Sequence, residues 1–127
     1  MEILTHDHEA GDSLEEFRKF RERMNSEILS ENNLVINRFF ALDTRTYEAG
    51  ALDVKTKELL GLVASLVLRC DDCVTYHLTR SAEEKVSRDE IFETLSVGLG
   101  VGGSIVIPHL RRAVATWSEL EAKSTDS

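Results

Sequence analysis

Apolar side chains recur at helical spacing in one segment of the 127-residue chain after another, and no run of β-branched residues shows the alternation of a strand. The chain contains a single proline, Pro108, so few positions forbid a continuous helix. Together these features predict an all-α fold of about six helices. Pro108 itself is expected in the first turn of the last helix, or at a kink within that helix.

Capping residues and apolar periodicity set the expected helix boundaries. The first expected helix begins at Ser13, which has the form of a capping box with Glu16, and the second covers Leu34 to Phe40. The third runs from Asp53 to about Leu68, and the fourth from Cys70 or Asp71 to about Glu84. The fifth begins at Ser87, which forms a second capping box with Glu90, and the sixth follows the glycines of 98–103 and ends near Leu120. The third helix is apolar around most of its circumference, which predicts a central position in the fold.

The length of the chain suits one domain with its own core, expected over residues 13–122. Residues 1–12 are interpreted as a mobile N-terminal tail and residues 123–127 as a C-terminal tail. The first tail contains four potential metal ligands, His6, Asp7, His8 and Glu9. A solvated tail is favoured over a metal site there, because chain termini are usually loose.

The net charge of −8 argues against nucleic acids and anionic membranes as partners, because both repel an acidic surface. The longest uncharged apolar stretch, Leu59 to Leu68, is too short to span a bilayer. No basic segment followed by an apolar one opens the chain, so a cytoplasmic location is expected. Two cysteines are also too few for a secreted disulfide scaffold of this length.

The two cysteines, Cys70 and Cys73, lie three residues apart at the expected start of a helix. Their helical rise of about 4.5 Å fits the window of roughly 4.4–6.8 Å between α-carbons that a disulfide needs. The helix start and Arg69 favour a thiolate, whereas the two aspartates between the cysteines oppose one. His77 shares the helix face of both cysteines and can relay a proton at neutral pH.

Glu58 lies on an otherwise apolar helix, where a carboxylate would be costly to bury without a partner. If the chain reverses near Arg69, the two helices run antiparallel. Glu58 then lies about 16 Å from the turn along one helix and His77 about 12 Å along the other. This ordering predicts a proton route from Cys73 through His77 to Glu58.

Two other interpretations of the same residues remain open. The cysteines could be small buried apolar residues, or they could bind zinc with His77 and Glu58 as the further ligands. His109 is a second candidate for the same pocket, although a packing role is favoured for it. Trp117 is expected in the core or at a subunit interface.

Several of these residues stand in a familiar arrangement. The stretch from Gly50 to Glu58, the motif Cys70-x-x-Cys73-x-x-x-His77, Glu90-Ile91 and Gly102-Gly103 resemble the carboxymuconolactone decarboxylase superfamily, and within it the alkyl hydroperoxidase D-like branch. The resemblance covers about residues 34–120. Two positions depart from the pattern: Arg69 stands where a small residue often precedes the first cysteine, and Lys85 stands where a glycine commonly ends the helix.

The resemblance implies an all-helical fold, assembly into homotrimers or homohexamers, and thiol-dependent reduction of hydroperoxides without a bound cofactor or metal. By this resemblance Cys73 would attack the peroxide, Cys70 would resolve it, and Glu58 and His77 would move protons. The helix start alone would favour Cys70 as the attacking residue, because Cys70 lies nearer to it. A dithiol donor, either a lipoyl group or a thioredoxin-like protein, would restore the pair. Lactone decarboxylation is not expected, because the decarboxylases typically lack the two cysteines. The alternative is a non-catalytic zinc-binding or assembly protein on the same scaffold.

Overall fold

The structure is a computed structural model that describes residues 10–126, with side chains described for residues 13–124. The described residues form six α-helices and one short 3₁₀ helix, without a strand, so the predicted all-α class is confirmed. The chain divides between Glu48 and Ala49 into two compact units. The candidate metal ligands of residues 6–9 lie outside the described residues.

The first unit contains α1 (Ala10–Ser30) and α2 (Leu34–Thr46), joined by a turn. Asn33 caps α2, because its side chain accepts a hydrogen bond from the backbone N–H of Ile36. Ser13 lies inside α1, so the expected capping box at Ser13 is wrong. The predicted end of α2 at Phe40 is also wrong, and α2 continues for six further residues without burying any of its own.

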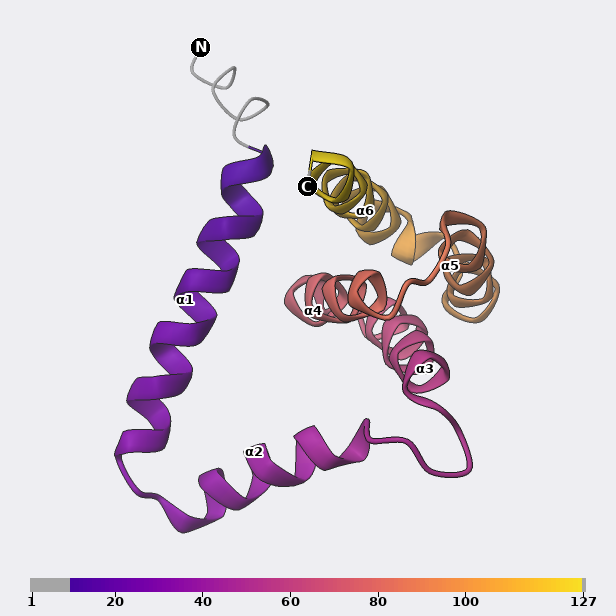
Figure 1. Cartoon of the computed structure of the whole chain (residues 1–127). Helices are drawn as coiled ribbons and strands as arrows, with labels where there is room; N and C mark the ends of the chain where they lie inside the picture. The colour runs from indigo at the N-terminus through magenta and orange to yellow at the C-terminus, as the bar shows by residue number, and fades with distance from the viewer. Residues whose placement is uncertain (1–9, 127) are drawn as a thin grey trace. The chain divides into compact units, whose positions relative to one another are not determined.

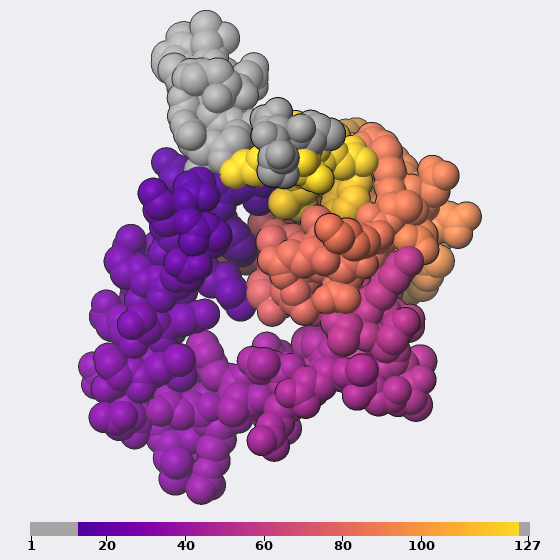
Figure 2. Space-filling view, in the orientation of Figure 1, coloured from indigo at the N-terminus to yellow at the C-terminus, as the bar shows by residue number. Residues whose placement is uncertain are grey.

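The second unit is a bundle of α3 (Val54–Val67), α4 (Asp71–Glu83), α5 (Arg88–Gly102) and α6 (Ile107–Asp126), with the 3₁₀ helix η2 (Ser104–Val106) before α6. Figure 1 shows these four helices gathered around one centre. In the space-filling view, the atoms of these helices form a continuous surface on the face that is shown (Figure 2).

The core of the second unit lies between α3 and the helices that pack on it, α4 and α5. The central position predicted for this apolar helix is therefore confirmed. Trp117 on α6 is buried in the same core, as expected. The buried apolar residues are Leu62, Leu66, Val74, Leu78, Val86, Ile91, Leu95, Val106, Ala113 and Trp117.

Local chemistry explains where the helices of this unit begin and end. Asp53 caps α3, and Ser87 with Glu90 forms the predicted capping box of α5. Arg69 and Lys85 adopt left-handed backbone angles, with φ values of 63° and 64°. Arg69 and Lys85 follow the last turns of α3 and α4. At such positions a left-handed backbone conformation costs a residue other than glycine about 1 kcal/mol.

Pro108 lies in the first turn of the last helix, one of the two positions expected for it, and its missing amide hydrogen breaks no helical bond there. Its end is later than expected, because α6 continues past Leu120 to Asp126. Helical structure thus extends beyond both boundaries predicted for the domain, at residues 13 and 122. Within the described residues, no helix combines the length and the apolar character needed to cross a bilayer.

Candidate active site

The turn between α3 and α4 carries both cysteines. Cys70 is the N-cap of α4, and its Sγ accepts a hydrogen bond from the backbone N–H of Cys73 at 3.2 Å. The two residues form a disulfide, with a distance of 5.3 Å between their α-carbons. Cys70 is half-buried, whereas Cys73 is exposed. The distance between the α-carbons is therefore within the range expected for a disulfide. Cys73 is the more accessible of the two residues to a reagent in solvent.

A buried carboxylate–imidazole pair lies between α3 and α4. Oε1 of Glu58 is 2.8 Å from Nδ1 of His77, and both side chains are buried. Because Oε1 accepts, the proton of this bond is carried by Nδ1. The left-handed Arg69 reverses the chain between the two helices, so residues 19 positions apart meet as predicted. A carboxylate bonded in this way fixes the orientation of the imidazole and sets its tautomer.

Arg80, on α4, lies beside the second oxygen of this carboxylate. Its Nε is 3.5 Å from Oε2 of Glu58, and its guanidinium also pairs with Glu83 and Glu84. Burial lowers the pKa of Arg80, but the carboxylates of Glu83 and Glu58 raise it by more, and the net direction is upward. The guanidinium therefore stays charged and partly compensates the buried carboxylate.

Gly61 provides the space that the imidazole occupies. A β-carbon at Gly61 would fall 2.6–2.9 Å from three ring atoms of His77, well inside contact distance. Gly61 lies three residues after Glu58, on the same face of α3. The absence of a side chain at this position thus allows α3 and α4 to approach closely enough for Glu58 to meet His77.

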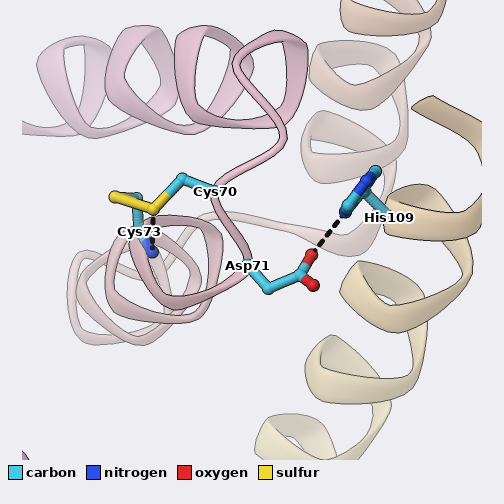
Figure 3. The surroundings of a disulfide bond; sticks show 4 residues. All are labelled: Cys70, Asp71, Cys73 and His109. Carbon is cyan, nitrogen blue, oxygen red and sulfur yellow. Dashed lines mark hydrogen bonds and ion pairs between the residues drawn. A yellow bond between two sulfur atoms is a disulfide. The ribbon is translucent and has the colours of Figure 1, made fainter. Parts of the chain in front are cut away.

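A second carboxylate–imidazole pair joins the first residue of α4 to the first turn of α6. Nδ1 of His109 is 2.7 Å from Oδ1 of Asp71, and Nη1 of Arg112 is 3.3 Å from Oδ2 of Asp71. Figure 3 shows the Asp71 carboxylate directed toward His109 and away from the sulfur atoms of Cys70 and Cys73. His109 therefore contacts the turn from α6 and does not join the Glu58–His77 pair.

The structure brings together the residues predicted in pairs, Cys70 with Cys73 and Glu58 with His77. Cys73 and His77 lie one helical turn apart on α4. Sequence reasoning missed Arg80 and Gly61, although their spacing held a signal. Arg80 follows His77 by three residues, and Gly61 follows Glu58 by three, so each shares a helix face with a candidate.

The zinc alternative finds no support in the part of the chain that the structure describes. No group of three or more histidine, cysteine, aspartate or glutamate side chains is placed there so that it could hold a metal ion. The two cysteine sulfurs are bonded to each other.

Comparisons with known proteins give the same fold and a family. A crystal structure of the Thermotoga maritima protein TM1620 is similar, with a TM-score of 0.86 and 54% sequence identity over 88% of this chain and 98% of that one. In a second crystal structure of TM1620 it is described as a carboxymuconolactone decarboxylase family protein, with a suggested involvement in antioxidative response. A family member from Legionella pneumophila, lpg0406, has a TM-score of 0.74 and 25% identity, and the match covers 87% of this chain and 96% of lpg0406.

An uncharacterized protein of Cupriavidus necator is 27% identical over 73 residues, which are 58% of this chain and 65% of that protein. The chain thus spans slightly less than two thirds of the length of this relative. The model of the carboxymuconolactone decarboxylase family matches residues 34–116, more than half of the chain. With its helical bundle and this match, the chain belongs to the carboxymuconolactone decarboxylase family.

Proposed function

We propose that the chain is a thiol-dependent peroxidase that reduces hydroperoxides through Cys70 and Cys73. The observation that carries the proposal is the buried Glu58–His77 pair, which lies one helical turn from an exposed cysteine of a CxxC disulfide. A titratable pair is costly to bury and tends to be found where protons must move. The suggested antioxidative role of TM1620 points in the same direction.

Cys73 is proposed as the attacking residue and Cys70 as the resolving one. The exposure of Cys73 favours contact with a peroxide, and its position on α4 is one turn from His77. The N-cap position of Cys70, where its Sγ accepts an N–H bond, favours a stable thiolate. A stable thiolate is also a good leaving group. Cys70 therefore suits the role of the sulfur that leaves when a reductant breaks the disulfide.

In the proposed cycle, a hydroperoxide oxidises the two thiols and a dithiol donor reduces them again. The Cys73 thiolate attacks one peroxide oxygen, the O–O bond breaks, and the alkoxide leaves as an alcohol after it takes up a proton. Cys73 is then a sulfenic acid. The Cys70 thiolate attacks the Cys73 sulfur, which forms the disulfide and releases hydroxide, and hydroxide becomes water with a second proton. A dithiol donor then reduces the disulfide and is itself oxidised to a disulfide.

Glu58 and His77 are proposed to supply and collect these protons. Nδ1 of His77 is bonded to Glu58, so Nε2 is the ring nitrogen that would exchange a proton with the sulfur or the leaving oxygen. Glu58 would stabilise the imidazolium that forms when the Cys73 thiol loses its proton. General acid–base assistance of this kind contributes about 10²–10⁴-fold to a rate.

A lipoyl group or a thioredoxin-like protein is the proposed donor, since either carries two thiols that can exchange with a disulfide. The cycle also suits the cytoplasm, where such dithiols are kept reduced. The direct test is turnover of a hydroperoxide with a dihydrolipoyl donor. We expect turnover by the wild-type protein and none by Cys73→Ser or Cys70→Ser. Undiminished turnover by Cys73→Ser, or an inactive wild-type protein that contains stoichiometric zinc, would contradict the proposal.

The role of Glu58 has its own test. Glu58→Gln keeps an oxygen that can accept the His77 N–H but removes the charge, so turnover should fall by about 10²-fold or more. Glu83→Gln is the matched control, because Glu83 also pairs with Arg80 but lies on the exposed side of that guanidinium. Equal turnover by Glu58→Gln and Glu83→Gln would remove Glu58 from the proton route.

We also propose that the chain works as a homotrimer or homohexamer. The supporting observation is an apolar stripe on α2, where Val35, Phe39 and Leu42 share one face and are each more than half exposed. A second copy would remove such a stripe from water. Light scattering should give three or six times the chain mass for the wild-type protein and a smaller assembly for Phe39→Asp. A monomeric wild-type protein would contradict the assembly.

A further inference from the structure

We propose that His109 is a positioning residue for the thiols, because its Nδ1–H holds the Asp71 carboxylate away from Cys70 and Cys73. The inference rests on the proposed thiol chemistry but concerns the cost of forming the thiolate. It can therefore be tested without a peroxide.

The location of Asp71 creates the need for such a contact. Asp71 follows Cys70 directly and is the first residue of α4. A negative charge beside a thiol disfavours the thiolate and slows its reactions. Asp72 carries a second negative charge in the same turn. The motif thus places two acids between the residues that must ionise.

The contact with α6 determines where one of these charges lies. His109 donates to Oδ1 of Asp71 at 2.7 Å, and Arg112 lies 3.3 Å from Oδ2. The carboxylate consequently points toward α6 rather than toward the sulfurs, as Figure 3 shows. Arg112 adds a positive charge next to it. Both effects reduce the repulsion that a thiolate at Cys70 or Cys73 would meet.

The contact also connects two helices at the site. Asp71 begins α4, whereas His109 lies in the first turn of α6 and is only partly exposed. A hydrogen bond between residues 38 positions apart therefore fixes the start of the cysteine helix relative to its neighbour. His109 acts through Asp71 and is not placed in contact with the reacting sulfurs.

The experiment measures the rate at which the reduced, full-length protein is alkylated by iodoacetamide, as a function of pH. Only the thiolate reacts, so the profile reports how readily the thiols ionise. At a pH below the midpoint of the wild-type profile, His109→Ala should react roughly two- to fivefold more slowly, because the released carboxylate can turn toward the sulfurs. His109→Asn should restore most of the rate, since its amide nitrogen can donate from nearly the position of Nδ1.

Four further variants separate this effect from a general loss of structure or charge. Asp71→Asn should react faster than His109→Ala, and adding His109→Ala to Asp71→Asn should change nothing further. Arg112→Ala should slow the reaction slightly, whereas Arg111→Ala, which removes the same charge from the same helix, should leave it unchanged.

The proposal is overturned if His109→Ala has the wild-type profile, or if His109→Asn is as slow as His109→Ala. It is also overturned if His109→Ala slows alkylation equally when Asp71 is already Asn. If His109→Ala does not fold, Asp71→Asn and Arg112→Ala still decide the matter, because a wild-type profile in both would contradict the proposal. If the variants show the predicted alkylation profiles but the protein does not turn over peroxide, the result counts against the proposed function alone.

Discussion

Two carboxylate–histidine pairs flank α4, and they differ in burial rather than in geometry. The atoms of the Glu58–His77 pair are 2.8 Å apart, and those of the Asp71–His109 pair 2.7 Å apart. The side chains of Glu58 and His77 are 1% and 9% exposed, whereas those of Asp71 and His109 are 43% and 20% exposed. The two pairs therefore differ in interaction energy although their distances are similar, because water screens the Asp71–His109 pair and not the Glu58–His77 pair.

The largest predicted difference between the pairs is in stability. Glu58→Ala removes the carboxylate that bonds the buried His77 imidazole and should lower the free energy of unfolding by about 3 kcal/mol. Asp71→Ala should lower it by about 1 kcal/mol at most, because the Asp71 pair is half-exposed. Urea unfolding of the disulfide form of each variant provides the measurement. Equal losses in the two variants would mean that burial does not distinguish the pairs.

A second prediction concerns the space that the buried pair needs. Gly61→Ala would place a β-carbon against the His77 ring and should cost about 1–3 kcal/mol of stability. Gly100→Ala is the matched control, because Gly100 is also helical and its β-carbon would meet no atom within 4 Å. That variant should gain about 0.5–1 kcal/mol. A stable Gly61→Ala protein with wild-type turnover would show that the close approach of α3 and α4 is dispensable.

The response to salt should separate the pairs on a smaller scale. Raising the ionic strength to about 1 M shortens the screening length to about 3 Å. The small loss of stability in Asp71→Ala should then largely disappear, while the loss in Glu58→Ala should persist. Urea unfolding at low and high salt tests this expectation. A loss in Glu58→Ala that falls with salt in the same proportion would indicate that water reaches Glu58.

The smallest predicted effect concerns Glu90, a surface carboxylate in the first turn of α5 that also pairs with Lys55 of α3. A side-chain bond to Lys55 and the backbone N–H of Ser87 hold the pKa of Glu90 below its ordinary value of 4.5. A carboxyl group whose pKa is lower in the folded than in the unfolded protein stabilises the fold at pH values above its unfolded-state pKa. This stabilisation is lost as the pH falls through the folded-state pKa. Glu90→Gln should therefore be less stable than the wild-type protein at pH 7.

The same variant should approach the stability of the wild-type protein in acid, where Glu90 is protonated in both folded and unfolded states. Asp89→Asn, in the same helical turn, is the control, since no capping bond of α5 involves its side chain. Urea unfolding at neutral and acidic pH gives the comparison. A difference in stability between Glu90→Gln and wild type that grows on acidification would contradict the lowered pKa of Glu90.

The sequence predicted best the features that depend on neighbouring residues. The caps of α3 and α5 follow from local hydrogen bonds, and the meeting of Glu58 with His77 follows from counting along two helices joined by a short turn. The end of α2 was predicted too early because its last residues are largely polar. Thr44 and Thr46 bond to carbonyls four residues earlier, so polar side chains there do not interrupt the helix.

The Asp71–His109 contact could not be derived from sequence in the same way. The two residues are separated by α4, α5 and η2, and only the packing of α6 against α4 brings them together. From the sequence, His109 is a candidate for the pocket of His77, although a packing role is favoured for it. Its position in the first turn of α6 directs it instead to the start of α4.

The most direct test of the central claim is a count of thiols after a single oxidation. The protein is fully reduced, freed of reductant and treated with one equivalent of hydroperoxide per chain. Both thiols should be lost together, with one alcohol formed per chain and a disulfide between Cys70 and Cys73 identified by mass. Two thiols still free after the peroxide has been added would contradict a peroxidase cycle at this pair.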